Sequence, residues 1–306
     1  MSQLSYSCTD IGYLLTSSMF KLTAFSILIF IALGNASFIE KSNFTKLTSK
    51  EIDIWDLGNQ TDELATDAVN RINGGRPVEQ IVPYQVSLQV HRRGRYHHFC
   101  SGSIISAQHV LTAAHCLTKM NPNEISVVVG TLTWRNGGDR HGVVAMRSHP
   151  GFSSSSLIIN DIAVLKVTPS FNLARTSIST ISLGNRARVG DKVPVRLTGW
   201  GSLTPTGSTG LPERLQVLDY HTISNQECAQ RGFRITANEL CALGERGRGA
   251  CVGDSGGPLT ISNGAPQLVG IVSYGTATCA LGRPDVYTRV SSFLPYINRV
   301  ISSEIP

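Results

Sequence analysis

The chain has 306 residues, of which 41% are hydrophobic and only 16% are charged, a balance typical of a globular protein rather than a disordered one. The formal net charge of +6 is unevenly divided, since residues 72–306 carry 22 Lys and Arg against 13 Asp and Glu, whereas residues 37–71 carry 4 against 7. A basic body can indicate nucleic-acid binding. The sequence has no nucleic-acid-binding motif, so we expect a solvated basic surface and no nucleic-acid partner.

The N-terminal segment, residues 1–36, has the features of a secretory signal peptide. A lysine precedes an apolar run from Leu22 to Leu33, and small residues follow it at the expected cleavage point. This run is shorter than the ~20 residues of a membrane span, so we favour a signal peptide over a type II membrane anchor. Met19 is the better candidate for the initiating methionine, which makes residues 1–18 an N-terminal extension ahead of the signal peptide. We therefore expect a secreted, extracellular protein with no membrane partner.

Residues 37–71 are polar, acidic and free of cysteine. They contain two acceptor motifs for N-glycosylation, at Asn43 and Asn59. Because no disulfide could stabilise a small accessory domain here, we interpret these residues as a removable pro-segment.

After this segment, short apolar stretches alternate with turn signals. The alternation in Gln85–Val90 predicts a strand with Val86, Leu88 and Val90 on one face. Val127–Val129 and Leu268–Val272 have the continuous apolar character of buried strands. Glycine, proline and asparagine clusters separate such stretches at short intervals.

The C-terminal segment has helical periodicity instead. Ser292 is a candidate N-cap, and Pro295 is tolerated in the first turn of such a helix. Many strands followed by one terminal helix indicate an all-β protein, either a barrel or a sandwich. The apolar positions with helical spacing are Val290, Phe293, Leu294, Ile297, Val300 and Ile301.

Three separate motifs contain the residues of a nucleophilic triad. The most specific is the hexapeptide Gly253–Pro258, Gly-Asp-Ser-Gly-Gly-Pro, whose serine is Ser255. His115 lies in a Leu-Thr-Ala-Ala-His-Cys segment, and Asp161 lies in an Asn-Asp-Ile-Ala-Val-Leu segment. Alone, a histidine beside a cysteine or an aspartate before an apolar run is more often structural. Together, in the order His, Asp, Ser, they favour a catalytic site.

With these motifs, the sequence from Arg71 to the C-terminus resembles the chymotrypsin/trypsin family of serine proteases. The resemblance implies a protease domain over residues 72–306 and an all-β fold of two six-stranded antiparallel β-barrels packed face to face, with a C-terminal helix. The first barrel is expected at about 72–185 and the second at about 186–306.

The resemblance also implies a mechanism. His115 would remove the proton of the Ser255 hydroxyl as it attacks a peptide carbonyl, and Asp161 would fix the imidazole tautomer. The backbone N–H groups of Gly253 and Ser255 would form the oxyanion hole. We expect activity to fall in acid as His115 becomes protonated.

The sequence Arg71-Ile72-Asn73-Gly74-Gly75 is similar to the activation site of this family. Cleavage after Arg71 by a trypsin-like protease would free the ammonium of Ile72, which would pair with Asp254 and order the oxyanion loop. Asn73 departs from the valine that is usual in the family. The chain is therefore interpreted as an inactive zymogen.

The chain has seven cysteines, and Cys8 lies ahead of the signal peptide. Spacing alone does not choose among the pairings of the other six. No Cys-x-x-Cys pair is present, and Leu132–His141, where the family's calcium loop is expected, offers only Asp139 as an acid. We therefore expect no metal and no cofactor. By resemblance, the disulfide pairs are Cys100–Cys116, Cys228–Cys241 and Cys251–Cys279.

The substrate pocket departs from that of the best-known members. Trypsin-type enzymes have an aspartate where this chain has Gly249, and Ser273, Tyr274 and Gly275 should form an open pocket wall. Asp285 stands where the family commonly has glycine. An acid at this position is similar to the arrangement in brachyurin-like arthropod enzymes. Such a pocket should accept aromatic and leucine side chains and reach arginine side-on. The alternative is that Asp285 turns away and bonds to the backbone, which would leave a chymotrypsin-like pocket.

Two other classes of function remain as alternatives. A non-catalytic homologue would act by binding partners, but such proteins usually lack a triad residue. A regulatory cascade protease would carry a disulfide-bonded leader domain, but this leader has no cysteine. We expect a monomer whose partners are protein or peptide substrates, the activating protease and protein inhibitors.

Overall fold

A computed structural model describes residues 74–184, 189–207, 210–261 and 263–303. The expected signal peptide, pro-segment, Cys8 and activation bond lie outside these described residues. All the described residues belong to one structural unit of the chain, Ile52–Pro306. Within them, no helix combines the length and the hydropathy that crossing a membrane requires.

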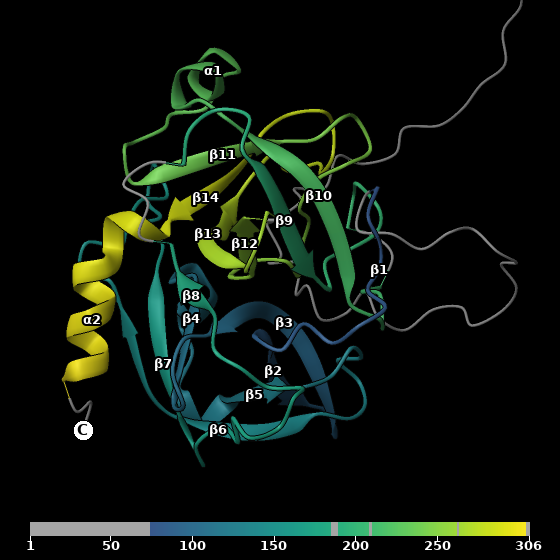
Figure 1. The fold of residues 1–306 in the computed structure, drawn as a ribbon, viewed down its shortest axis with the longest axis vertical. Helices are drawn as coiled ribbons and strands as arrows, with labels where there is room; N and C mark the ends of the chain where they lie inside the picture. Colours follow the sequence, from purple (N-terminus) through teal and green to yellow (C-terminus); the bar gives the residue numbers. More distant parts are fainter. Residues whose placement is uncertain (1–73, 185–188, 208–209, 262, 304–306) are drawn as a thin grey trace, which may run out of the picture. The chain divides into compact units, whose positions relative to one another are not determined.

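Six antiparallel strands close the first barrel in the order β2-β3-β4-β7-β6-β5 (Figure 1). Val86 and Leu88 of β2 point into its apolar core, and the predicted buried strand Val127–Val129 forms most of β5. The strands are β2 (Gln85–Arg92), β3 (Arg95–Ile104), β4 (His109–Thr112), β5 (Ile125–Val129), β6 (Asp139–Ser148) and β7 (Ala163–Thr168).

The strands of the second barrel follow the order β10-β11-β14-β13-β12-β9. The last strand, β9, pairs with its neighbour β12 and also with the first strand, β10, so this barrel is closed too. The predicted buried strand Leu268–Val272 lies within β13 and is buried throughout. Together the two barrels confirm the predicted all-β fold. The strands are β9 (Pro194–Gly199), β10 (Gln216–Ile223), β11 (Glu239–Leu243), β12 (Pro258–Ile261), β13 (Gln267–Tyr274) and β14 (Asp285–Arg289).

Elements outside the two barrels link one barrel to the other. β1 (Arg76–Pro77) pairs with β10, and β8 (Ser182–Leu183) pairs in parallel with β13. After β14 the 3₁₀ turn η4 (Val290–Phe293) leads into helix α2 (Leu294–Ser302; Figure 1), whose Tyr296 hydroxyl donates a hydrogen bond to the Arg147 carbonyl of β6. Apolar side chains of η4 and α2 join the core of the first barrel.

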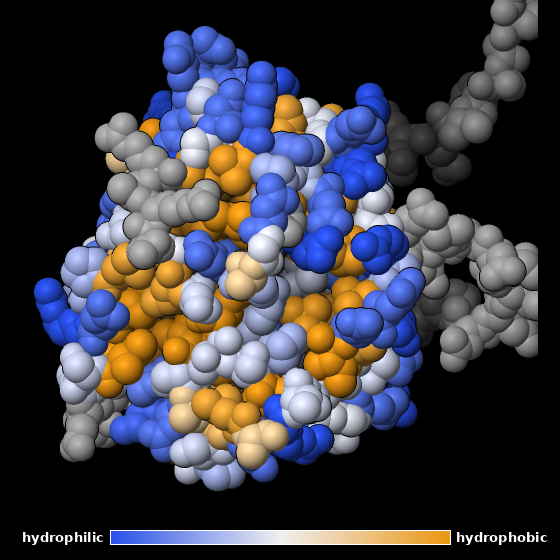
Figure 2. All heavy atoms as spheres, in the orientation of Figure 1, coloured by the Kyte–Doolittle hydropathy of each residue, from blue (hydrophilic) through white to orange (hydrophobic). Residues whose placement is uncertain are grey.

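Two local features differ from the sequence predictions. Ser292 is not the N-cap of α2, because η4 runs directly into the helix and places Phe293 at that position without a side-chain cap. A short helix, α1 (Asn225–Gln230), was not predicted; Ser224 caps it by accepting a hydrogen bond from the Glu227 N–H at 3.0 Å. The face of the molecule over α1 is hydrophilic (Figure 2).

Both faces of β2 are buried, although its alternation predicts only one apolar face. The polar residues Gln85, Ser87 and Gln89 are each at most 2% exposed. Thr198 of β9 donates a hydrogen bond to Gln85 Oε1 at 2.7 Å, and Gln89 Nε2 donates one to the Trp134 carbonyl at 2.7 Å. These polar side chains are buried because the second barrel and the β5–β6 connection cover this face, and hydrogen bonds offset part of the cost of their burial.

Candidate active site

Asp161 holds the ring of His115 through two contacts. Its Oδ1 accepts a hydrogen bond from the His115 backbone N–H at 2.8 Å, and its Oδ2 lies 2.7 Å from His115 Nδ1. The Asp161 side chain is 2% exposed and that of His115 is 26% exposed. The carboxylate is thus shielded from water while part of the imidazole remains accessible. This geometry favours the tautomer with a proton on Nδ1, which leaves Nε2 free to accept one.

Asp161 lies just before β7 of the first barrel but is anchored by the second. Ser273 Oγ donates a hydrogen bond to Asp161 Oδ2 at 2.6 Å, and Thr288 Oγ1 donates one to the Asp161 carbonyl at 2.7 Å. Ser273 was predicted to line the substrate pocket, whereas its hydroxyl contacts Asp161. Thr288 carried no signal in the sequence, because only the pairing of distant strands brings it to this position.

Ser255 lies in a turn that packs against β3 and β4 of the first barrel. The Ser101 N–H donates a hydrogen bond to the Ser255 carbonyl at 2.7 Å. The next residue, Gly256, has φ +77°, and a Cβ there would lie 2.2 Å from Thr112 Oγ1. Thr112 ends β4, three residues before His115. Glycine is therefore required for this close approach, which brings Ser255 to the edge of the barrel that carries His115.

Gly253, the other predicted oxyanion residue, is also held by β3. It has φ +100°, and a Cβ there would lie 3.0 Å from the Leu211 side chain. His98 Nε2 lies 2.9 Å from the Gly253 carbonyl, and His98 Nδ1 lies 2.8 Å from Ser87 Oγ. Burial lowers the pKa of His98 to about 4, so it stays neutral and donates through Nε2. No sequence pattern indicated this contact of His98.

Asp254, between these two glycines, is fully buried. Its Oδ2 accepts a hydrogen bond from the Cys251 N–H at 2.9 Å, and its Oδ1 accepts one from the Gly201 N–H at 2.8 Å. Burial raises the pKa of this carboxyl to about 6, and the two N–H donors oppose the rise. The residue predicted to pair with it, Ile72, lies outside the described part of the chain.

The carboxyl of Asp285 lies between the two glycines of the predicted pocket. A Cβ on Gly249 would be 3.0 Å from Asp285 Oδ2, and a Cβ on Gly275 would be 3.1 Å from Asp285 Oδ1. The Ala250 N–H donates a hydrogen bond to Oδ2 at 2.7 Å. The side chain thus bonds to the backbone, as one alternative expected, and yet stays between the two glycines, as the other alternative expected. Burial and the nearby Asp254 charge raise its pKa to about 7.

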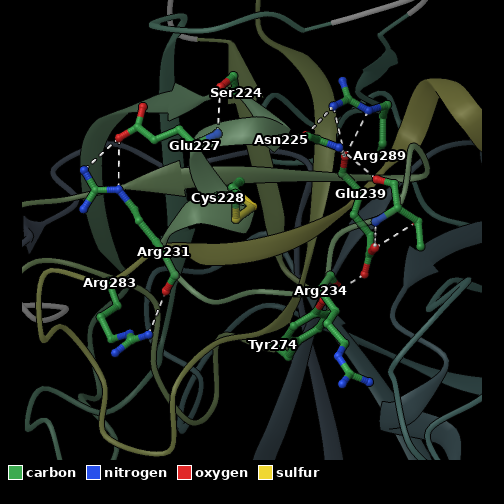
Figure 3. Close-up of a disulfide and its surroundings, with 12 residues drawn as sticks. Ser224, Asn225, Glu227, Cys228, Arg231, Arg234, Glu239, Tyr274, Arg283 and Arg289 are labelled. Carbon is green, nitrogen blue, oxygen red and sulfur yellow. Dashed lines mark hydrogen bonds and ion pairs between the residues drawn. A yellow bond between two sulfur atoms is a disulfide. The ribbon is translucent and has the colours of Figure 1, made fainter.

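Tyr274, also predicted at the pocket, directs its side chain elsewhere. Its hydroxyl donates a hydrogen bond to Glu239 Oε1 at 3.0 Å and also lies 3.3 Å from the Arg234 carbonyl (Figure 3). Its ring packs near Phe233, with 6.4 Å between centroids. The ring therefore belongs to the small apolar cluster around the Cys228–Cys241 disulfide.

The three disulfides implied by the resemblance are present. The first lies beside His115, and the second joins α1 to β11. The third joins the segment before Ser255 to the loop after β13. The sulfur atoms of the first pair lie within 4.8 Å of a His115 nitrogen, but they are bonded to each other and are not free to bind a metal. The pairs are Cys100–Cys116, Cys228–Cys241 and Cys251–Cys279.

Asp139, the single acid of the predicted loop after β5, is engaged in an ion pair. Arg175 Nη1 lies 2.7 Å and 2.8 Å from its two carboxylate oxygens.

Comparison with known proteins agrees with this geometry. The family model described as Trypsin matches residues 72–297. Chymotrypsin-2 of Vespa crabro is 36% identical over 218 residues, which cover 71% of this chain and 93% of that protein. Trypsin epsilon of Drosophila erecta is 36% identical over 248 residues, which cover 79% of this chain and 92% of that protein. Trypsin of Sarcophaga bullata is 34% identical over 232 residues, covering 74% and 87%. The chain therefore belongs to the trypsin family of serine proteases.

Proposed function

We propose that this chain is the zymogen of a secreted serine endopeptidase that cleaves peptide bonds with Ser255, His115 and Asp161. The observation that carries the proposal is the buried Asp161 carboxylate, which binds both the backbone and the ring of His115 at 2.8 and 2.7 Å. The Ser255 turn packs against the same barrel edge. The family supplies the general activity, a serine endopeptidase, and this geometry supports the assignment of its residues.

In the proposed reaction, Ser255 Oγ attacks the scissile carbonyl carbon and its proton passes to His115 Nε2. The C–N bond then breaks as His115 gives that proton to the leaving amine, which leaves an acyl ester on Ser255. Water, deprotonated by His115, hydrolyses the ester. The N–H groups of Gly253 and Ser255 would stabilise the oxyanion of each tetrahedral intermediate, with a contribution of about 3–4 kcal/mol per donor.

Activation is proposed to follow cleavage after Arg71. The new ammonium of Ile72 would pair with Asp254, whose carboxyl is fully buried and has its pKa raised to about 6. A cation beside that carboxyl would favour its ionised form and offset the cost of burying the charge. Because Asp254 lies between Gly253 and Ser255, its position sets the position of both oxyanion donors.

Secretion is proposed from the N-terminal sequence and from the three disulfides, since such bonds persist in oxidising compartments.

The proposed specificity is broad. A pocket with glycine at positions 249 and 275 has room for aromatic and leucine side chains, and the Asp285 carboxyl between them could bind the guanidinium of arginine. The names of the relatives include both trypsin and chymotrypsin, so they do not decide between these preferences.

The test is a panel of peptides that differ only in the residue before the scissile bond. The zymogen is cut with trypsin, which is then inhibited and removed, and kcat/KM is measured for Phe, Tyr, Leu and Arg. We expect comparable cleavage after all four, because the pocket combines open walls with a carboxyl. Cleavage after Phe, Tyr and Leu alone would mean that Asp285 does not reach substrate.

The uncut zymogen and an Arg71→Gln chain, treated in parallel, should stay at background. Absence of hydrolysis by the correctly cut protein would contradict the proposed function and favour a non-catalytic homologue.

A further inference from the structure

Two buried carboxylates, those of Asp285 and Asp254, accept hydrogen bonds from consecutive backbone N–H groups. The Ala250 N–H donates to Asp285 Oδ2 at 2.7 Å, and the next N–H, that of Cys251, donates to Asp254 Oδ2 at 2.9 Å. Asp285 is 7% exposed and Asp254 is 0% exposed. In a region shielded from water the charge of Asp254 repels a charge on Asp285, so the second carboxyl to ionise does so at higher pH.

The two carboxyls are not equally supported. Asp254 accepts hydrogen bonds from two backbone N–H groups, those of Cys251 and Gly201, whereas a single N–H group, that of Ala250, bonds to Asp285 among the described residues. Hydrogen bonds from N–H donors favour the ionised form of a carboxyl. Asp285 is therefore the weaker acid of the pair. Burial and the charge of Asp254 raise the pKa of Asp285 to about 7, against about 6 for Asp254.

The other charged and titratable groups on β11, β13 and β14, the strands around Asp285, are directed elsewhere. On β11, Glu239 accepts hydrogen bonds from Tyr274 of β13 and from Thr236. On β14 itself, Arg289 donates to the Glu239 and Val189 carbonyls, and Tyr287 bonds to Tyr220. In the segment before Gly249, Arg248 donates to the Asp219 carbonyl. Within the described residues, Asp254 is the charge that acts on Asp285.

We propose that the preference of this enzyme for the residue before the scissile bond changes with pH, because the loss of a single proton from Asp285 lets a pocket that accepts uncharged side chains bind cationic ones as well. The inference rests on the proposed function and specifies the substrate class of its pocket. Below the transition the carboxyl is neutral, and an arginine side chain would lose its water without gaining a counter-charge. Above the transition the carboxylate forms a charge-assisted hydrogen bond with the guanidinium.

Activation should move the transition. An ammonium beside Asp254 would cancel much of the repulsion that Asp254 exerts on Asp285. The pH midpoint of Asp285 ionisation in the cut enzyme is therefore expected at or below that of the uncut chain. The measurement of cleavage rates must for this reason extend down to about pH 5.

The test compares three peptides that are identical except for arginine, citrulline or phenylalanine before the scissile bond. Citrulline has nearly the shape of arginine but no charge. Since all three are cleaved by the same triad, protonation of His115 cancels in the ratio of their kcat/KM values. This ratio reports the ionisation of the free enzyme. From pH 5.5 to 8.5 we expect the arginine-to-citrulline ratio to rise about 30-fold for a midpoint near 7, and to level off above it.

The arginine-to-phenylalanine ratio should rise in parallel, and both ratios should be independent of pH in Asp285→Asn and in Asp285→Gly. The measurement on the unaltered enzyme is decisive even if a variant does not fold. Active enzyme with a constant arginine-to-citrulline ratio from pH 5 to 9 would overturn this inference and leave the proposed function standing. Absence of hydrolysis of all three peptides would overturn the proposed function, and the inference with it.

Discussion

Replacing Ser255 by alanine in the activated protein is expected to lower kcat by about 10⁶-fold, because no other group can form the acyl-enzyme. The Ser255 hydroxyl is the proposed nucleophile, and the His115–Asp161 pair has no proton to accept without it. The residual rate should exceed that of the uncatalysed reaction by roughly 10³-fold, since the oxyanion donors and substrate binding remain. Steady-state hydrolysis of a peptide substrate, corrected for added trypsin, measures the loss.

The control for this variant is its fold and its processing. Ser255 is only partly buried, and its backbone carbonyl rather than its hydroxyl carries the contact with Ser101. The Ser255→Ala zymogen should therefore be cut after Arg71 at the normal rate and unfold at the same urea concentration as the unaltered zymogen. A correctly folded and cut variant that keeps more than a few per cent of the activity would contradict the assignment of the nucleophile.

Replacing Gly256 by alanine should destabilise the protein by roughly 2–5 kcal/mol, which combines the cost of a left-handed backbone with overpacking. A Cβ at this position would lie 2.2 Å from Thr112 Oγ1 and 2.5 Å from the Ser101 carbonyl. The turn would have to move away from β4, and with it the nucleophile. Urea denaturation of the zymogen in a Ser255→Ala background measures the change in the free energy of unfolding without self-digestion.

Gly94 provides the matched control for this substitution. It has the same φ of +77°, but a Cβ there would meet no atom within 4 Å. Gly94→Ala should therefore cost only the backbone term, roughly 1–2 kcal/mol. Equal losses for the two variants would show that the close approach to Thr112 contributes nothing.

The fold and the site were predictable where a local pattern carries the information. The motif around Ser255 is specific because the turn needs glycine on both sides, at Gly253 and Gly256, for backbone conformations and approaches that a Cβ would obstruct. The apolar runs of β5 and β13 are likewise set by burial on both faces.

Contacts between distant elements could not be predicted in the same way. The hydrogen bonds of Ser273 and Thr288 to Asp161 join residues more than 100 positions apart, and serine or threonine on a strand has no pattern that indicates its partner. The polar face of β2 similarly gave no sign of burial, because the second barrel is what covers it. The direction of Tyr274 depends on Glu239, whose position follows from the pairing of β11 with β14.

Asp285 shows an intermediate case. Its place in the sequence predicted a position at the pocket, but not whether it would bond to the backbone or face the substrate. The structure has it between Gly249 and Gly275 with one backbone hydrogen bond, from Ala250. That outcome depends on the position of the Ala250 N–H, which no sequence motif describes.

The central claim, that this chain is a zymogen whose nucleophile is Ser255, is tested most directly by covalent labelling. The zymogen is cut after Arg71, the added protease is removed, and the protein is treated with a fluorophosphonate that phosphonylates activated serine residues. Mass spectrometry should find one adduct per chain, on the peptide that contains Ser255, and none in the uncut zymogen or in Ser255→Ala. Complete cleavage after Arg71 without an adduct on Ser255 would contradict the claim.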